Sequence, residues 1–196
     1  IVSGQGVILG NAEKEFKSFV EKSGIPAAWT ILGASALPTS HELNVGMVGM
    51  HGNYGPNILT NQCDLLIAIG MRFDDRVTGD INSYAKQAKI IHLEIDPVEI
   101  DKNIKVDVPV LGDCKESLAM LSKNIKTKSY KNWLKIFDDL MKKEFNKVIK
   151  NDLSPKKKGL TMGESIIAIN KFTKGKAIIV SDVGQHQMVA CRYANF

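Results

Sequence analysis

The sequence predicts an open, mainly parallel α/β sheet with helices on both faces. Short apolar runs alternate with helical patterns along its 196 residues, as they do in βαβ units. Each apolar run ends in glycine or polar residues, which is typical of strands whose carboxyl ends open onto a ligand crevice. Hydrophobic residues make up 44% and charged residues 24% of the chain, as in ordinary globular proteins.

The strands of this sheet are expected at the start of the chain and at four later apolar runs. Ile1 and Val2 have the character of the last residues of a strand. The later runs cover residues 26–30, 63–70, 89–95 and the stretch VPVLGD at 108–113. We therefore expect five strands whose carboxyl ends meet at one edge of the sheet.

Helices are expected between these strands. The glycine-rich turn SGQGVILG leads into an amphipathic helix with Phe16, Phe19 and Val20 on one face and Gly24 as its C-cap. A second helix is predicted over residues 116–125. A third is predicted over 131–149, because its apolar positions recur at spacings of three and four.

The chain divides into three parts. Residues 1–126 are expected to form the first domain, and residues 127–160 an amphipathic helix and a basic linker that contains NDLSPKKKG. Residues 161–196 would begin a second, incomplete domain. Thr161 and Glu164 fit a capping box ahead of a helix over 165–172, and KAIIVSDVGQHQ is expected to form a buried strand that ends in a polar loop.

Several classes of protein are disfavoured. No apolar stretch approaches the roughly 20 residues of a membrane helix and no signal segment opens the chain, so we expect a cytoplasmic protein. Cys63, Cys114 and Cys191 lack metal or disulfide spacing and are expected to be buried thiols. The net charge of +5 comes largely from lysines between Lys123 and Lys158, which favours a solvated helix and linker over a nucleic-acid surface.

Four polar or glycine-rich stretches follow predicted strands and would line a common crevice. GQGVILG has its glycines at 4, 6 and 10, so a dinucleotide loop and a plain tight turn remain equal alternatives. The other stretches are TILGASALP at 30–38, GMRFDDRVTG at 70–79 and LEIDPVEIDKN at 93–103. An extended dinucleotide would fit the edge that they form.

The charged stretch at 70–79 offers specific roles. Gly70 would let the backbone approach a ligand, and Arg72 and Arg76 would neutralise a pyrophosphate or bind a carboxylate with two hydrogen bonds. Asp74 and Asp75 would hold these guanidinium groups or receive ribose hydroxyls. The alternative is a surface ion-pair cluster, which contributes little stability.

Other polar residues have weaker signals. Glu94, Asp96 and Glu99 suit ribose hydroxyls or an adenine amino group, and their charge argues against a 2′-phosphate. His51 lies in GMVGMHGNYGPN at 46–57, which is expected to be a glycine-dense loop, and it either faces a ligand there or belongs to a plain turn cluster. His92 is expected in the core. The sequence has no Gly-x-Ser-x-Gly elbow, P-loop or metal-binding histidine spacing, so hydrolysis by such sites has no support.

Four stretches resemble the catalytic subunit family of acetolactate synthase, also called acetohydroxyacid synthase, in order and spacing. They are GMVGMHGNYGPN, CDLLIAIGMRFDDRVTG, KIIHLEIDPVEIDKN and DVGQHQM. The resemblance covers nearly the whole chain and thins between Lys126 and Gly159. It implies that 1–126 is the Rossmann-like central FAD-binding domain of a thiamine-diphosphate enzyme and that 161–196 begins its carboxyl-terminal thiamine-diphosphate-binding domain. ILGASALP and Val189 depart from the usual pattern, which has LMGLGAFP and an aromatic residue.

The resemblance also implies the roles of individual residues. Arg76 would receive the carboxylate of a second 2-keto acid, and Met50 would line its path. Thiamine diphosphate would be touched by Val183, Gly184, Gln185 and His186. The implied FAD positions are Gly4, Gly6, Thr30, Ile31, Leu32, Gly49, Met50, His51, Gly70, Arg72, Asp74, Arg76, Val77, Glu94, Ile95, Glu99, Gly112 and Asp113.

The family's activity is a thiamine-dependent carboligation, which is a transferase reaction. It decarboxylates pyruvate and joins the hydroxyethyl unit to pyruvate or 2-ketobutyrate in valine, leucine and isoleucine biosynthesis. The resemblance implies FAD, thiamine diphosphate, magnesium with ligands outside these residues, and a homo-oligomer, and it leaves open a regulatory small subunit. The activating glutamate and the metal motif are absent from these residues, so the chain alone is expected to be inactive.

Two alternatives stay open. One is another FAD- and thiamine-diphosphate-dependent enzyme, of the glyoxylate carboligase or pyruvate oxidase type. The other is a stand-alone nucleotide-binding module. We expect neither a nucleic-acid nor a membrane partner for any of these.

Overall fold

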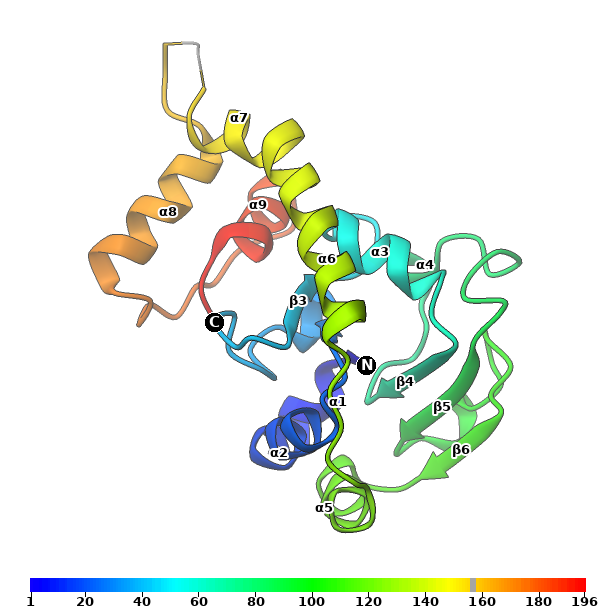
Figure 1. The fold of residues 1–196 in the computed structure, drawn as a ribbon. Coiled ribbons are helices and arrows are strands. Elements are labelled where there is room, and N and C mark those ends of the chain that lie inside the picture. The colour runs from blue at the N-terminus through cyan, green and yellow to red at the C-terminus, as the bar shows by residue number, and fades with distance from the viewer. Residues whose placement is uncertain (156–157) are drawn as a thin grey trace.

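The computed structural model describes residues 1–155 and 158–196, and its described strands form one sheet of six strands in the order β3-β2-β1-β4-β5-β6 (Figure 1). All neighbouring strands are parallel. The strands are β1 (Val2–Ser3), β2 (Ala27–Trp29), β3 (Asn44–Met47), β4 (Leu65–Ile69), β5 (Lys89–Glu94) and β6 (Val108–Leu111). The predicted α/β fold is confirmed. The chain order reverses at β1, between β2 and β4, and ligands bind at such a switch point in open α/β sheets.

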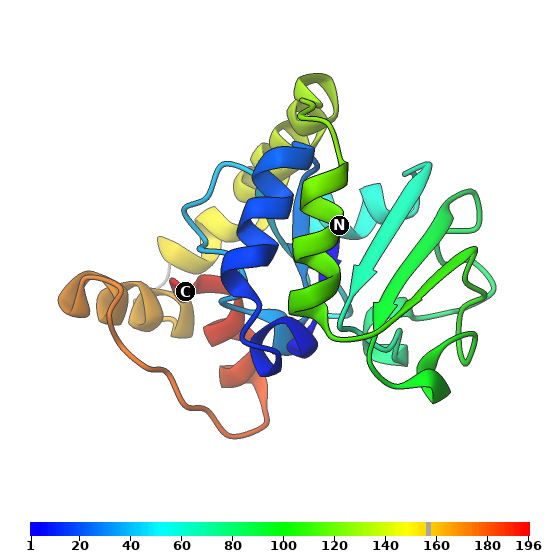
Figure 2. The same cartoon turned by 90° about the horizontal axis from the view of Figure 1, so that it is seen from below.

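The helices flank this sheet on both faces, as predicted. In β4, Leu66 and Ala68 pack in the core that includes α3 and α6, whereas Ile67 and Ile69 pack in the core that includes α2 and α5. Figure 2 shows α2 in blue and α5 in green side by side on one face. In chain order the elements are α1 (Gln5–Leu9), α2 (Glu13–Ser23), η1 (Ile31–Gly33), α3 (Tyr54–Thr60), α4 (Asp75–Thr78), η2 (Pro97–Glu99), α5 (Cys114–Asn124), α6 (Lys131–Glu144), η3 (Phe145–Ile149), α7 (Lys150–Leu153), α8 (Met162–Thr173) and α9 (Gln185–Tyr193).

The first long helix, α2, forms where its apolar spacing predicts. It buries Phe16, Phe19 and Val20, and it ends at Gly24, whose backbone N–H donates to the carbonyl of Val20. The turn before it is more structured than expected, because residues 5–9 form the short helix α1.

Two helices begin earlier than predicted because of their caps. Asp113 caps α5, which therefore starts at Cys114 and not at residue 116. The capping box is confirmed: the Thr161 hydroxyl accepts from the Glu164 N–H at 3.1 Å, and the Thr161 N–H donates to the Glu164 carboxylate at 2.8 Å. Because the helix begins directly after its cap, α8 starts at Met162.

The helix predicted over 131–149 forms and continues further. Its apolar face places Phe137 in the core, with Trp133 and Leu140 packed against it. A π-helical turn, η3, and α7 extend it to Leu153. Lys156 and Lys157, two lysines of the predicted linker, lie outside the described residues.

The prediction of a strand within KAIIVSDVGQHQ is wrong. Residues 176–184 form neither helix nor strand, and Gln185 begins α9. The side chains of Ile178 and Val180 are 93% and 90% exposed. The apolar run favoured a strand, but none of the described strands lies alongside it, and a strand needs a neighbour for its backbone hydrogen bonds.

The glycine-dense stretch at 46–57 was expected to be a loop, and this expectation is wrong at both ends. Its first residues complete β3, and its last residues begin α3. The pairing of β3 with β2 is irregular, with a register shift between Ala27 and Ala28. Because of its glycine and its irregular pairing, this short strand lacks the apolar pattern from which a strand is predicted.

The described residues add two findings on the classes of protein considered above. None of the described helices is long and apolar enough to cross a membrane. Cys114 is buried as expected, and burial raises the pKa of its thiol to about 11, whereas Cys63 and Cys191 are only half-buried. The expectation of three buried thiols is therefore right for Cys114 alone.

Candidate functional site

A crevice of about 400 Å³ lies at the carboxyl ends of the strands, beside the switch point. Three of its walls come from the ends of β2, β3 and β4, and a fourth comes from the segment that leads into α9. Its lining residues are Thr30, Ile31, Leu32, Met47, Val48, Met50, His51, Arg72, Asp74, Asp75, Arg76, Val77, Val183, Gln187 and Met188.

The loop after β4 alternates between core and crevice. Met71 and Phe73 are buried, whereas the side chains of Arg72 and Arg76 are 67% and 72% exposed. β5 supports the loop from behind, because His92 Nε2 lies 2.7 Å from the Met71 carbonyl oxygen and its ring packs edge-on against Phe73. His92 is fully buried, as predicted, and this burial lowers its pKa, so the neutral ring donates from Nε2.

The four charged residues of this loop form two exposed pairs. Arg72 Nε lies 3.8 Å from Asp74 Oδ2, and Arg76 Nη1 lies 3.8 Å from Asp75 Oδ2. Asp74 also caps α4, since its Oδ1 accepts from the Arg76 N–H at 3.0 Å. Exposed pairs of this kind contribute only about 0–1 kcal/mol. The guanidinium groups therefore stay available to an anionic ligand such as a phosphate or a carboxylate.

A second loop, after β3, joins the first. The Met50 N–H donates to the Arg76 carbonyl at 2.8 Å. Asn57 of α3 holds the neighbouring Gly49 from both sides, since its Oδ1 accepts from the Gly49 N–H and its Nδ2 donates to the Gly49 carbonyl, each at 2.8 Å. His51 Nε2 is buried and has no hydrogen-bond partner among the described residues. This orphan nitrogen beside the crevice fits a polar ligand group.

The glycines of the predicted dinucleotide loop serve close packing between two backbones. The Gly4 N–H donates to the Ile69 carbonyl at 2.9 Å, and the Gly6 N–H donates to the Gly70 carbonyl at 3.0 Å. A Cβ on Gly70 would lie 2.6 Å from the Gly6 Cα, and Gly70 has a φ of +57°. These contacts support the tight-turn alternative, and they explain why position 70 requires a glycine even without a ligand.

The predicted carboxylates of β5 lie at the same edge but outside the crevice. Glu94 Oε1 accepts from the N–H groups of Ile95 at 2.9 Å and Asp96 at 3.2 Å. Glu99 pairs with Lys102 at 2.6 Å, and its Oε2 is buried without a hydrogen-bond partner among the described residues. The remaining predicted positions of this edge follow β6: Gly112, whose N–H donates to the Glu94 carbonyl, and Asp113, which caps α5.

The segment predicted to touch thiamine diphosphate reaches the crevice in part. Val183 lines it, Gly184 precedes α9, and Gln185 and His186 form the start of that helix. Gln187 and Met188, in the first turn of α9, line the crevice as well. Lining residues for which no ligand role was predicted are Met47, Val48, Gln187 and Met188, and Asp75 was predicted only as a charge partner or a ribose ligand.

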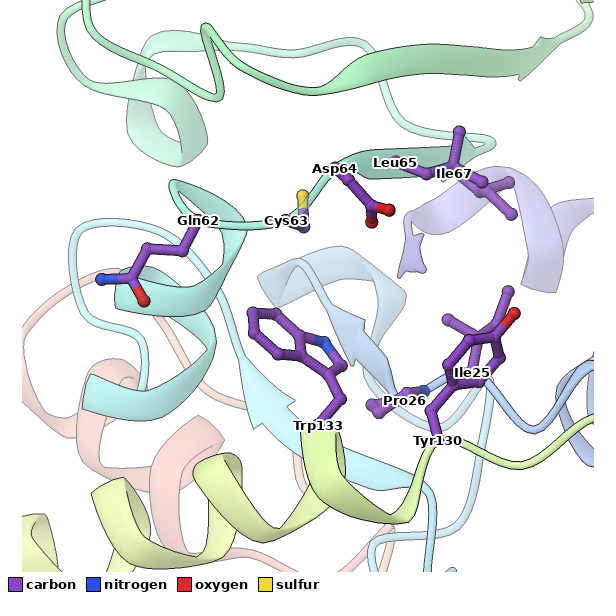
Figure 3. Close-up of a pocket in the computed structure, with 9 residues that line it drawn as sticks. All are labelled: Ile25, Pro26, Gln62, Cys63, Asp64, Leu65, Ile67, Tyr130 and Trp133. Carbon is purple, nitrogen blue, oxygen red and sulfur yellow. The ribbon is translucent and has the colours of Figure 1, made fainter.

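A second hollow of about 420 Å³ lies at the opposite edge, near the amino ends of β2 and β4 (Figure 3). Tyr130 and Trp133, from the start of α6, point into it together with residues that precede the two strands. Asp64 is the one charged residue in its described lining. Because no cationic side chain is among these described lining residues, this hollow suits an anionic ligand less well than the crevice does.

In residues 1–155 and 158–196, no three His, Cys, Asp or Glu side chains lie close enough together to hold a metal ion.

Comparison with known proteins gives one family and a consistent set of relatives. Residues 1–121 match the family model of the thiamine pyrophosphate enzyme central domain. The acetolactate synthase large subunit of Buchnera aphidicola subsp. Acyrthosiphon pisum (strain APS) is 36% identical over 100% of the chain and 34% of its own length. That of Lactococcus lactis subsp. lactis (strain IL1403) is 39% identical over 98% and 33%. The probable acetolactate synthase large subunit of Methanocaldococcus jannaschii is 40% identical over 96% and 32%. The chain thus spans about a third of the length of these relatives.

Proposed function

The chain belongs to the thiamine pyrophosphate enzyme central-domain family, and on this premise we propose that it is part of the large, catalytic subunit of an acetolactate synthase. Such an enzyme decarboxylates pyruvate and condenses the hydroxyethyl unit with pyruvate or 2-ketobutyrate. The relatives named acetolactate synthase large subunit support this, because 36 to 40% identity extends over 96 to 100% of the chain.

The observation that carries the proposal is the composition of the crevice. One wall presents the exposed guanidinium groups of Arg72 and Arg76, and another is formed by Val183, Gln187 and Met188. An enzyme that joins two keto acids needs a cation for the second carboxylate close to its thiamine site. We assign this role to Arg76. Met50, tied to Arg76 through the backbone, would supply an apolar surface for the alkyl group of the keto acid.

We propose that FAD binds in extended form along the carboxyl edge of the sheet, from the end of β5 and β6 to the crevice. The residues fit such a ligand, because the edge holds buried polar atoms that lack partners among the described residues, at Glu99 and at His51. A ribose hydroxyl and a polar flavin group would satisfy them. Gly4, Gly6 and Gly70 would shape the backbone beside this cofactor through their mutual packing. The condensation has no net redox change, so the FAD would be structural.

Thiamine diphosphate would be touched by Val183, Gly184, Gln185 and His186, as the resemblance implies. When bound, it supplies the nucleophilic carbon that decarboxylation of a 2-keto acid requires. The crevice would orient the second keto acid toward that carbon and shield both from water. We place the magnesium ligands and the activating glutamate in parts of the enzyme outside these 196 residues.

The proposed organisation follows from this assignment. Residues 1–126 would form the central domain, 127–160 the connecting helix and linker, and 161–196 the opening of the thiamine-diphosphate-binding domain. The relatives are named large subunits, which implies that they have small-subunit partners. We propose a homo-oligomer with such a regulatory partner for the protein that carries this chain.

The test is product formation by the full-length protein that carries this sequence. It is incubated with thiamine diphosphate, Mg²⁺ and FAD, either with pyruvate alone or with pyruvate and 2-ketobutyrate. We expect acetolactate in the first reaction and acetohydroxybutyrate in the second, with no product when thiamine diphosphate is left out. Oxidation of pyruvate, or carboligation of glyoxylate only, would overturn the assignment in favour of a related enzyme. Nucleotide binding without any product would favour a binding module.

A further inference from the structure

One buried carboxylate joins two helices that lie on different sides of the crevice. Glu144, at the end of α6, is 5% exposed. Its Oε2 accepts from the N–H of Tyr54, the first residue of α3, at 3.0 Å. Its Oε1 pairs with Arg192 near the end of α9. Neither Glu144 nor Arg192 lines the crevice.

The link to α3 reaches one wall of the crevice. The side chain of Asn53, the residue before α3, does not cap this helix. Glu144 accepts a hydrogen bond from the first N–H group of α3 in its place, and it puts negative charge at the start of the helix. One turn further along α3, Asn57 holds Gly49 through two hydrogen bonds of 2.8 Å. Gly49 begins the loop that carries two lining residues. The position of Glu144 is therefore transmitted to this wall through one short helix.

The link to α9 reaches the wall that is formed by Val183, Gln187 and Met188. Arg192 lies four residues after Met188, about 6 Å along the helix axis, and Gln187 and Met188 line the crevice. Its side chain is 20% exposed, and its Nε is buried without a hydrogen-bond partner in the described part of the chain. The pair with Glu144 is therefore the main polar anchor of the Arg192 side chain. A displacement of Arg192 would move the first turn of α9 with it.

Burial makes this pair sensitive to position. A buried ion pair is a weak source of net stability, but loss of one partner leaves an unpaired charge with no water to solvate it. The two charges therefore favour one arrangement of their helices over displaced ones. The pair between Lys142 and Asp139 on the same helix lacks this property, because its atoms are 3.8 Å apart and its side chains are 75% and 62% exposed.

We propose that Glu144 and Arg192 are positioning residues that fix the separation of the two walls of the crevice. They would thereby align the loop after β3, and the arginine-bearing loop after β4 that is hydrogen-bonded to it, with the proposed thiamine-diphosphate segment at the start of α9. This inference rests on the proposed function for its catalytic meaning. The geometric link itself requires only the hydrogen bonds and the ion pair described above.

The first test measures keto-acid kinetics in the full-length protein. Arg192→Met keeps an unbranched apolar stem close to that of arginine and removes the guanidinium group with its charge. We expect it to raise the KM for the second keto acid at least fivefold. Glu144→Gln should have a similar effect, and the double variant should be no worse than either single variant, since both changes break the same link. Lys142→Met, which breaks the exposed pair on α6, is the matched control and should stay within twofold of the parent.

The outcomes that would overturn the inference are distinct. Multiplied effects in the double variant would show that the two residues act independently. An equal effect of Lys142→Met would show a general effect of charge on α6. A lower melting temperature of Arg192→Met with an unchanged KM would show that the pair contributes to stability but does not position the walls of the crevice. Arg192→Lys keeps the cation without the planar fork and should give intermediate values, which makes it the second variant if Arg192→Met does not fold.

A second readout separates this inference from the proposed function. Amide hydrogen exchange is followed in peptides that cover residues 49–57 and 184–190, with Arg192→Met compared with Lys142→Met. We expect faster exchange in both peptides for Arg192→Met alone. This result would support the link even in a protein that makes no acetolactate. Unchanged exchange in both peptides would refute the link even if the enzyme is active.

Discussion

The backbone N–H of Met50 donates to the carbonyl oxygen of Arg76 at 2.8 Å. The two residues proposed to meet the second keto acid follow different strands, yet one hydrogen bond holds them together. The side chain of Arg76 is free to turn toward the crevice, because its only ion-pair partner in the described residues, Asp75, is 77% exposed and 3.8 Å away. The proposed substrate end of the crevice thus combines a hydrogen-bonded backbone with an exposed cation.

Replacing this cation tests its role. We predict that Arg76→Gln in the full-length enzyme raises the KM for the second keto acid about 10- to 100-fold, because a hydrogen bond to a charged group contributes about 1.5–3 kcal/mol. Steady-state kinetics with 2-ketobutyrate as the varied substrate measures this. Arg72→Gln, in the same loop and equally exposed, is the control: it should change this KM less than about twofold and weaken FAD retention instead. Equal KM changes in the two variants would contradict the separate roles.

Gly70 should be intolerant of any side chain. A Cβ there would lie 2.6 Å from the Gly6 Cα, at a φ of +57°. We expect Gly70→Ala to lower the free energy of unfolding by about 2–5 kcal/mol, from backbone strain plus overpacking. Gly79 has a similar φ of +59° but a ψ of −130° and nothing within 4 Å of the added Cβ, so Gly79→Ala should cost backbone strain alone, about 1–3 kcal/mol. Urea denaturation measures both, and equal losses would show that close packing at Gly70 is not required.

His92 should make stability depend on pH. Burial lowers the pKa of His92 from 6.5, although the Glu94 carboxylate lies 3.8 Å away. The contribution of the neutral His92 ring to the free energy of unfolding is therefore fully present above about pH 6.5. As the pH falls through that value, the unfolded chain binds a proton that the folded chain refuses, and stability is lost by at most about 1.4 kcal/mol per pH unit. His92→Gln, which does not titrate and keeps a donor for the Met71 carbonyl, should lose less.

The measurement for His92 is the free energy of unfolding at pH 7.5 and pH 5 for both proteins. The two proteins share every other titratable group, so the difference between them isolates His92. The same loss of stability in both would rule out the buried neutral imidazole.

Asp113 offers a way to separate a cap from a cofactor contact. Its Oδ1 accepts from the N–H groups of Lys115 at 2.8 Å and Glu116 at 3.4 Å, at the start of α5. We predict that Asp113→Ala lowers the free energy of unfolding by about 1 kcal/mol and that Asp113→Ser restores most of it. Thermal unfolding checks this, and a serine variant as unstable as the alanine variant would contradict the cap. FAD retention by the serine variant tests the proposed cofactor role separately.

Much of the fold could be predicted from local patterns. β4 and β5 are apolar runs that end in glycine or carboxylate residues, and α2 and α6 show apolar faces at helical spacing. β3 could not be found in this way, because Gly46 interrupts it and its pairing with β2 is irregular. The strand expected at KAIIVSD shows the opposite error, since strand formation also needs a neighbour that an apolar run cannot reveal.

The site divides along the same line. Arg72 and Arg76 could be proposed because charges directly after a buried strand are costly without a role. Gln187 and Met188 could not, because they reach the crevice only through the packing of α9, whose contacts include that of Arg192 with a residue 48 positions away. The glycines of the first loop had two equal interpretations, and only the spatial contact of Gly6 with Gly70 supports one of them.

We propose that the carboxyl edge of the sheet and the crevice belong to a flavin-containing thiamine enzyme. Cofactor analysis of the purified full-length protein tests it most directly. After denaturation, the released flavin and thiamine diphosphate are identified and quantified by liquid chromatography against protein concentration. We expect FAD and thiamine diphosphate in roughly equal amounts per subunit, with FAD lost preferentially in Arg72→Gln. A folded, active protein that retains thiamine diphosphate but neither contains nor binds FAD would contradict it.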